Sequence, residues 1–166
     1  SNQRKTVIQM TQQNGDIVEY EPSMAEDVAE MFNGFKESWP GGFGGGIPFD
    51  EERIHDWLDE SSAIVDYIAL DEDGIPVGFC NLEPHWRDND AAYIGLLGVI
   101  SRVKGQKFGK RLLLKSIERA GEEGVKRVDL HTWSGNLSAM PLYKKIGMFW
   151  VPDTSVYMQD YIPLLH

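Results

Sequence analysis

The chain has 166 residues, of which 42% are hydrophobic and 25% charged, and 16 basic against 26 acidic residues give a net charge of −10. This length suits one domain, expected over residues 1–166, and the composition excludes disordered and fibrous classes. The acidic balance argues against a nucleic-acid partner, because binding a phosphate backbone requires an excess of Lys and Arg. A cationic partner is mildly favoured, although surface acid that maintains solubility explains the charge equally well.

The number of cysteines and the length of the apolar runs limit the cellular compartments that we expect for this protein. The one cysteine, Cys80, excludes an intramolecular disulfide and leaves a zinc site without a second thiol. No His, Cys or Asp cluster has ligand spacing, so no metal site is expected. No apolar run reaches the roughly 20 residues that cross a bilayer, and no signal-peptide core is visible. We therefore expect a cytoplasmic protein without a membrane partner.

The first 60 residues predict two helices separated by a glycine-rich loop. Residues 22–26 have the Ser-x-x-Glu spacing of a capping box, and apolar residues recur on one helical face over 24–35. Residues 39–49 contain five glycines, which lose much backbone entropy in regular structure, so this segment is expected to be a mobile loop. Asp50 is expected to cap a second helix, whose apolar face lies within 54–58.

Three strands are predicted next, and they form an antiparallel meander. Residues 63–70 and 75–82 are joined by an Asp-Glu-Asp-Gly sequence at 71–74, which is typical of a hairpin turn. Residues 91–100 are apolar almost throughout, as expected of a strand covered on both faces. A helix over 108–120 then leads to a strand over 128–132, which implies a right-handed parallel crossover.

The end of the chain predicts one more helix and further strands. Asn136 or Ser138 is expected to cap this helix, Pro141 is tolerated only in its first turn, and Gly147 ends it. Residues 149–161 supply one or two final strands. The fold class is therefore α/β with a mixed sheet.

The segment from residue 91 to residue 117 contains no Asp or Glu. Six basic residues fall there: Arg102, Lys104, Lys107, Lys110, Arg111 and Lys115. A solvated helix face could produce this by chance, but a site for a polyanion explains it better. Exposed backbone N–H groups, the positive end of a helix dipole and flanking lysines together suit a pyrophosphate.

Two common phosphate-binding motifs do not fit this loop. Arg111 follows Gly109-Lys110 where a Walker A loop has Ser or Thr, and no G-x-G-x-x-G fingerprint occurs. A nucleotidase and a nicotinamide enzyme are therefore disfavoured. The alternative interpretation is that Gly105 and Gly109 only form a tight turn and that the loop binds no ligand.

The loop resembles the GNAT acetyltransferase superfamily. Residues 104–109, Lys-Gly-Gln-Lys-Phe-Gly, are in register with its Arg/Gln-x-x-Gly-x-Gly/Ala motif, although Lys107 replaces the first glycine. The side chain of Lys107 either hinders a close backbone approach or adds an ammonium contact to a phosphate. The resemblance implies coenzyme A binding by Leu97, Gly98, Val99, Lys104, Gly105, Gln106, Lys107, Phe108, Gly109, Lys110 and Asn136.

A second block of residues matches the same superfamily. Its Leu-x-Val…Asn-x-x-Ala-x-x-Leu-Tyr-x-Lys-x-Gly-Phe pattern is met by Leu130, Thr132, Asn136, Ala139, Leu142, Tyr143, Lys145 and Gly147, with Met148 in the Phe place. The resemblance covers roughly residues 67–158. It implies a GNAT-like mixed, mostly antiparallel central sheet with helices on both faces, and acetyl-CoA as the acyl donor.

The resemblance also implies direct acetyl transfer to a primary amine of a small molecule or protein. A backbone N–H at the end of strand 91–100 would stabilise the oxyanion, Tyr143 would protonate the departing thiolate, and Glu83 would be the base. Asn136 would contact the pantetheine. Each has a plain alternative: Tyr143 as a packing residue, Asn136 as a helix cap and Glu83 as an exposed turn carboxylate.

Four further side chains are weaker candidates. His131 could accept a proton, but strand alternation sends it to the face opposite Leu130. His85, Trp86 and Trp133 could line the mouth of an acceptor site, although isolated surface aromatics are common.

Rival functions stay open at this point. The chain could be a catalytically weak acyl-CoA-binding sensor or regulatory module, and the apolar stretch 161–166 could lead into a further C-terminal domain of a longer protein. A homodimer and a longer acyl donor are also open.

Overall fold

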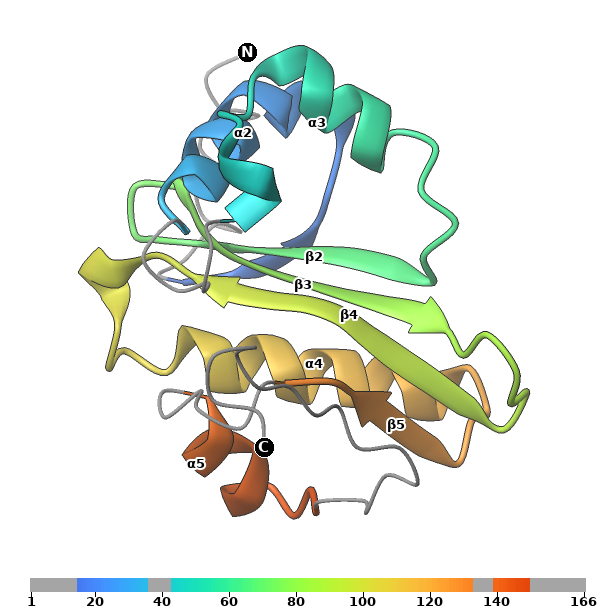
Figure 1. The fold of residues 1–166 in the computed structure, drawn as a ribbon. Helices are drawn as coiled ribbons and strands as arrows, with labels where there is room; N and C mark the ends of the chain where they lie inside the picture. The colour runs from blue at the N-terminus through green and yellow to red at the C-terminus, as the bar shows by residue number, and fades with distance from the viewer. Residues whose placement is uncertain (1–14, 36–42, 133–138, 150–166) are drawn as a thin grey trace, which may run out of the picture. The chain divides into compact units, whose positions relative to one another are not determined.

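The computed structural model describes residues 15–35, 43–132 and 139–149. The chain divides into two compact units, residues 1–131 and 132–166, and each is described by itself. The first unit carries one sheet and most of the helices (Figure 1). No helix in the described ranges is long and apolar enough to span a bilayer.

The first unit is built on a five-stranded sheet in the order β1-β2-β3-β4-β5. Its strands are β1 (Ile17–Glu19), β2 (Val65–Leu70), β3 (Pro76–Pro84), β4 (Ala91–Val99) and β5 (Arg127–Leu130). The first four pair antiparallel and β5 pairs parallel to β4. The predicted meander, the parallel crossover and the mixed sheet are therefore confirmed.

Strand β1 was not predicted. It is three residues long and too short to show an alternating pattern, and it exists because its backbone pairs with β2, where Ile17 faces Ala69 and Glu19 faces Tyr67. Such an edge strand is decided by tertiary pairing, since strand propensity depends strongly on context.

The first predicted helix forms, but without its capping box. A 3-10 turn, η1 (Pro22–Met24), leads directly into α2 (Ala25–Asn33), so the residue before the α-helix is Met24, which has no side-chain cap. Ser23 is inside the turn, and so does not occupy the cap position that the Ser-x-x-Glu spacing predicted. The predicted cap of α3 (Glu51–Leu58) is confirmed, because Asp50 Oδ1 accepts the Arg53 N–H at 2.8 Å. Such a cap is worth about 1 kcal/mol.

The described residues include part of the glycine-rich segment. Residues 36–42 lie outside the described residues, while η3 (Phe43–Gly46) forms a short 3-10 turn with Gly44 and Gly45 at positive φ. The prediction of a segment without regular structure is thus wrong for 43–46. A ring cluster explains the difference: Phe43 packs against Phe49 at 5.4 Å and against Phe32 at 5.7 Å.

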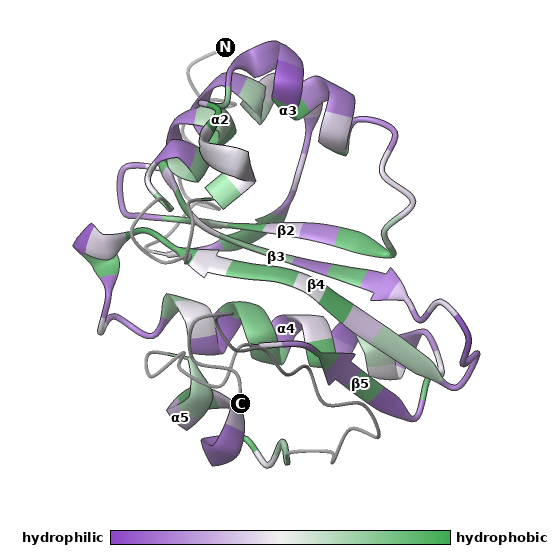
Figure 2. Cartoon of the chain, viewed as in Figure 1, coloured by the Kyte–Doolittle hydropathy of each residue, from purple (hydrophilic) through white to green (hydrophobic). Residues whose placement is uncertain are grey.

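Helices cover both faces of the sheet. Helices α2 and α3 lie on one face, and α4 (Phe108–Glu122) lies on the other (Figure 1). Figure 2 shows hydrophobic residues concentrated along β2, β3 and β4, with β3 turning polar toward its end. Phe32 is central to the α2–α3 side, where its buried ring meets the rings of Phe35, Phe79 and Trp57. This arrangement confirms the predicted helices on both faces.

The second unit contains α5 (Met140–Lys145). Pro141 lies in its first turn, as predicted, and the residue before the helix is Ala139. Asn136 and Ser138, which were expected to cap the helix, lie outside the described residues. The φ of Gly147 is +99°, just past the helix end, as a terminating glycine requires. Of the final strands expected over 149–161, only Phe149 is among the described residues, and it is not in a strand. The rest of this segment lies outside the described residues.

Candidate functional site

The loop between β4 and α4 presents an uncapped helix N-terminus. After η4 (Ser101–Val103) the chain turns at Gly105, with φ +83°, and enters α4 at Lys107, which caps the helix only with its backbone. The first turn of α4 holds no acidic residue. Among the described residues, no acceptor is found for the N–H groups of residues 108–110. This end of α4 is therefore suited to an anion.

Lys107 has the left-handed backbone that a glycine adopts easily. Its φ of +67° makes it the one non-glycine residue at positive φ within the described ranges. The conformation costs a residue with a Cβ about 1 kcal/mol. The sequence match had placed the first motif glycine here, and the backbone agrees with that match although the side chain does not.

We expect Lys107→Gly to raise the melting temperature. Removing the left-handed strain of about 1 kcal/mol should shift it upward by about 2–4 °C. Lys107→Ala is the matched control, because it removes the same charge but keeps the Cβ. Thermal unfolding of the three proteins checks this, and an equal gain in the alanine variant would assign the effect to charge rather than to backbone.

The basic residues of the segment 91–117 differ in whether they form an ion pair with another described residue. Arg102 is already engaged by Asp71, whose Oδ2 lies 2.7 Å from Nη2, and the backbone N–H groups of Asp73 and Ile75 also bind Asp71. These contacts outweigh burial and lower the pKa of the Asp71 carboxyl. Lys104, Lys107 and Lys110 form no ion pair with any described residue. The ammonium groups around the uncapped turn are thus unengaged by the described part of the chain.

Strands β4 and β5 separate just before this loop. Their parallel pairing runs only from Ala91–Arg127 to Ile94–Leu130, while β4 continues to Val99 along β3. Figure 1 shows the two strands diverging, with α4 behind them. The candidate residues Leu97, Gly98 and Val99 lie on this extension of β4. Gly98 also has a packing role, since a Cβ there would lie 3.0–3.3 Å from the ring of Phe35.

A bulge shifts the register of β4 beside the point of separation. Cys80 pairs with Leu97 but Leu82 pairs with Ile94, so β4 has one residue more than β3 across this interval. The buried Asn81 fills the bulge: its Oδ1 accepts the Leu96 N–H at 2.7 Å. The backbone of β4 is therefore held in an irregular conformation by one side chain of β3.

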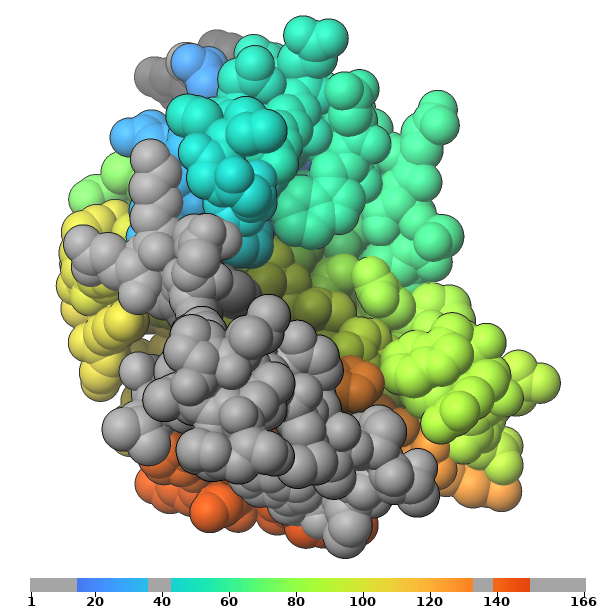
Figure 3. All heavy atoms as spheres, in the orientation of Figure 1, coloured from blue at the N-terminus to red at the C-terminus, as the bar shows by residue number. Residues whose placement is uncertain are grey.

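The bulge lies next to the carboxylate of Glu83. Asn81 Nδ2 donates to Glu83 Oε1 at 2.9 Å, so the amide orients the carboxylate. A Cβ at Gly95 would lie 3.0 Å from that same Oε1, and Gly95 itself is exposed. The missing side chain thus leaves the carboxylate bordered by open surface. In Figure 3 the atoms of β3 and β4 are recessed between α3 and the turn that joins the two strands.

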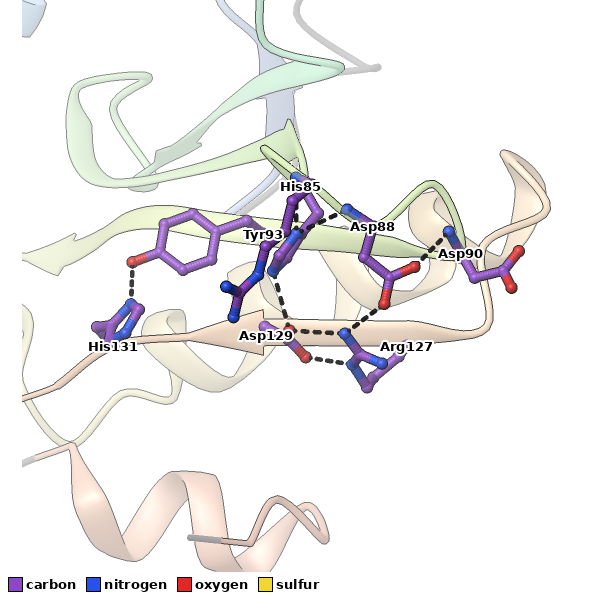
Figure 4. Close-up of polar contacts among 8 residues, drawn as sticks. His85, Asp88, Asp90, Tyr93, Arg127, Asp129 and His131 are labelled. Atoms are coloured by element: carbon purple, nitrogen blue, oxygen red, sulfur yellow. Dashed lines mark hydrogen bonds and ion pairs between the residues drawn. The ribbon is translucent and has the colours of Figure 1, made fainter. Parts of the chain in front are cut away.

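The same face of the sheet carries a tyrosine and a histidine. Tyr93 pairs with Glu83 across β3 and β4, so their side chains are neighbours on one face. The Tyr93 hydroxyl lies 2.7 Å from His131 Nδ1 (Figure 4). Burial raises the pKa of Tyr93, so its phenol is protonated at neutral pH and can donate to that nitrogen. His131 does alternate away from Leu130, as predicted, and the face it reaches is that of Glu83.

Two groups complete the surroundings of the site on the sheet. Asp66 pairs with Asn81 in register, and burial, the main cause, together with the nearby charge of Glu83 raises its pKa. Cys80 points the other way, toward Ser116 of α4, and burial raises the pKa of its thiol to about 12. Cys80 therefore cannot serve as a thiolate nucleophile.

The sequence-predicted candidates thus separate into three groups. The loop residues 104–110 and the strand end 97–99 lie along one continuous path, and Glu83 lies on β3 beside the bulge. Tyr143 lies in α5, in the second unit. Asn136 and Trp133 lie outside the described residues. Within the described ranges, no three His, Cys, Asp or Glu residues are grouped to hold a metal ion.

Sequence reasoning missed Asn81, Tyr93 and Gly95. Asn81 carried a usable signal, because it is a polar residue within the otherwise apolar run 76–82 and a buried amide needs partners. Tyr93 and Gly95 carried none, since their place beside Glu83 depends on the strand register and on the bulge.

The fold and the site define a class of protein: an α/β domain with a splayed parallel strand pair and a helix start that is suited to an anion. A family model described as the acetyltransferase (GNAT) family matches residues 28–148. The chain belongs to the GNAT acetyltransferase family.

Individual similarities agree with this family. The chain is 32% identical over 87 residues to N-alpha-acetyltransferase 30 of Saccharomyces cerevisiae, a match that covers 49% of each chain. The matches span between 28% and 49% of the lengths of the curated relatives.

Solved structures show the same fold. An integron cassette protein from the mobile metagenome of V. cholerae has a TM-score of 0.70 at 19% identity, over 92% of this chain and 96% of that one. AAC(6')-Iy in complex with the bisubstrate analog CoA-S-monomethyl-acetylneamine has a TM-score of 0.65 at 17% identity, over 90% of this chain and 100% of that one.

Proposed function

We propose that this acetyltransferase moves the acetyl group of acetyl-CoA to a primary amine by direct transfer. The observation that carries the proposal is the uncapped start of α4, which the η4 turn and the loop at Gly105 join to the stretch of β4 that has no β5 partner. A pyrophosphate bound at residues 108–110 would place the rest of the cofactor along Gly95–Val99, which leads back to Glu83.

The cofactor end of the site uses backbone and lysine groups. The N–H groups of residues 108–110 would bind phosphate oxygens, with Lys104, Lys107 and Lys110 supplying charge around them. The extension of β4 would bind the pantetheine by backbone hydrogen bonds. A backbone N–H near the bulge would stabilise the oxyanion that forms during transfer.

The acceptor end of the site requires a base. An alkylamine with a pKa near 10 arrives as an ammonium ion and must lose a proton before its nitrogen can attack. Glu83 accepts that proton, directly or through a water molecule. The nitrogen then bonds to the thioester carbon, the C–S bond breaks, and Tyr143 gives its proton to the departing sulfur. The nitrogen loses its second proton to solvent, and solvent returns a proton to the Tyr143 phenolate. Tyr143 enters this scheme from its place in the sequence motif.

A binding-only function is the second candidate, and Lys107 is the observation that favours it. A Cβ at this left-handed position narrows the approach of a cofactor to the loop backbone. Such a protein would bind acyl-CoA as a sensor or regulatory module without turnover.

Thiol release from acetyl-CoA over a panel of amines separates the two functions. The panel should contain small alkylamines, diamines, arylalkylamines and a short peptide with a free N-terminus, since the yeast relative is named for N-alpha-acetylation. We expect release that depends on at least one acceptor. Binding without acceptor-dependent release would favour the sensor, and absence of acetyl-CoA binding would overturn both functions.

A further inference from the structure

The turn between β3 and β4 presents an aromatic side chain at the surface. Trp86 is 60% exposed although it is the largest side chain type, and exposure of so much apolar area is costly. Its ring is nevertheless held in place, because it stacks on the ring of His85 with centroids 4.0 Å apart and an interplanar angle of 20°.

His85 is itself fixed by hydrogen bonds. Its side chain is only 5% exposed, and its Nδ1 accepts the backbone N–H groups of Arg87 and Asp88 at 3.3 and 3.2 Å. Nδ1 therefore carries no proton, and Nε2 is left to donate toward Asp129 Oδ2 at 3.4 Å (Figure 4). The His85 ring that stacks on Trp86 is thus held in one orientation and does not rotate freely.

The Trp86 ring also adjoins the proposed acceptor site. It meets the Tyr93 ring edge to face at 5.1 Å and lies nearly parallel to the His131 ring at 6.2 Å. Tyr93 is in turn the cross-strand neighbour of Glu83. A molecule whose amine reaches Glu83 would therefore extend along Tyr93 toward Trp86.

The carboxylates around this turn all have cationic partners. Asp88 and Asp129 both bind Arg127, at 2.8 Å each, and Asp90 lies 3.8 Å from Lys126. These carboxylates thus already have cationic partners, and a second positive charge on the acceptor would have to compete with Arg127 or Lys126 for them. A neutral planar group fits the exposed π-face better than a second cation does.

We propose that Trp86 binds a planar ring carried by the acceptor, so that the substrate class is a primary amine on a short alkyl linker attached to an aromatic ring. This inference rests on the proposed acetyltransferase function and adds a specificity-determining residue to it. His85 is a positioning residue that acts through Trp86.

Steady-state kinetics with matched amines test the inference. The probes are 2-phenylethylamine, 2-cyclohexylethylamine of similar size but without a planar ring, n-butylamine, and cadaverine with a second ammonium group. We expect 2-phenylethylamine to have the lowest KM, and Trp86→Ala to raise that KM about 5- to 10-fold with kcat nearly unchanged. Trp86→Phe should keep most of the preference, and Leu114→Ala, at another exposed apolar side chain, should change nothing.

The outcomes distinguish this inference from the function on which it rests. If n-butylamine is acetylated but Trp86→Ala alters all four KM values equally, or none, the ring site is wrong and the acetyltransferase stands. A preference for cadaverine that Trp86→Ala abolishes would assign the site to a second cation and would also overturn it.

A binding experiment covers the case without turnover. Saturation transfer from the protein to 2-phenylethanol, which has the ring but no amine, should occur with the unmodified protein and fall at least 3-fold in Trp86→Ala. Transfer that Trp86→Ala does not reduce would overturn the ring site whatever the kinetics. Binding of 2-phenylethanol with no amine acetylated would instead overturn the proposed enzyme and leave the ring site in place.

Discussion

Glu83→Gln should lower kcat/KM for the amine acceptor by about 10³-fold. General-base catalysis typically contributes 10²–10⁴-fold, and the glutamine amide keeps the shape of the side chain but cannot take up the proton. Asn81 can still hydrogen-bond the new side-chain oxygen, so the bulge that it supports should persist. The measurement is acceptor-dependent thiol release together with the Kd of acetyl-CoA, which we expect to change less than 3-fold.

Glu30→Gln is the matched control for this variant. Glu30 is an exposed carboxylate on α2 whose side chain has no hydrogen bond to a described residue, and its removal should leave kcat/KM unchanged. Normal activity in Glu83→Gln would refute Glu83 as the base. The Tyr93–His131 pair, 2.7 Å apart on the same face, would then be the next group to vary.

Tyr143→Phe should lower kcat by about 10²-fold and leave the Kd of acetyl-CoA nearly unchanged. A phenol that protonates the leaving thiolate acts only in the transition state, so its loss reduces turnover rather than cofactor binding. An acetyl thioester of a more acidic thiol should be less affected, because its thiolate leaves with less help. This dependence on the leaving group is the readout that a packing role for the ring would not produce.

Tyr20→Phe provides the control for loss of a phenol hydroxyl. Tyr20 binds Asp59 at 2.8 Å beside the end of α3, and no step of the proposed reaction uses it. Equal losses of kcat and of acetyl-CoA affinity in Tyr143→Phe would contradict an acid and favour a structural residue. A smaller kcat loss with the more acidic thiol would support the acid.

The local features that the sequence predicted correctly share one property: their signal lies within a few consecutive residues. Asp50 caps α3 because its carboxylate needs to reach only three residues along the chain. The turn over 71–74 forms because the Asp71 carboxylate accepts the backbone N–H groups of Asp73 and Ile75. The capping box at Ser23 failed because an equally local 3-10 turn, begun by Pro22, occupies its place.

The candidate site could be predicted in part. The sequence indicated residues at the ends of its predicted elements, but not contacts between residues on different strands. Glu83 and the loop over 104–110 were selected as candidates because they stand at the ends of predicted strands and helices. Asn81, Gly95 and Tyr93 were not, because their relation to Glu83 requires the register of β3 against β4. His131 shows both cases: its face followed from alternation, but the fact that Glu83 shares this face did not.

By itself the sequence determined the order of the main strands and helices, the class of the fold, the family and the basic loop after β4. These follow from hydrophobic periodicity and from contiguous motifs, which need no knowledge of what lies opposite. Tertiary structure alone decided that β1 exists, that β4 bulges opposite Asn81, and that Trp86 is held by His85 beside Tyr93. The physical reason is that these features are made by hydrogen bonds and ring contacts between different strands and turns, and their energies depend on register and shape rather than on local residue type.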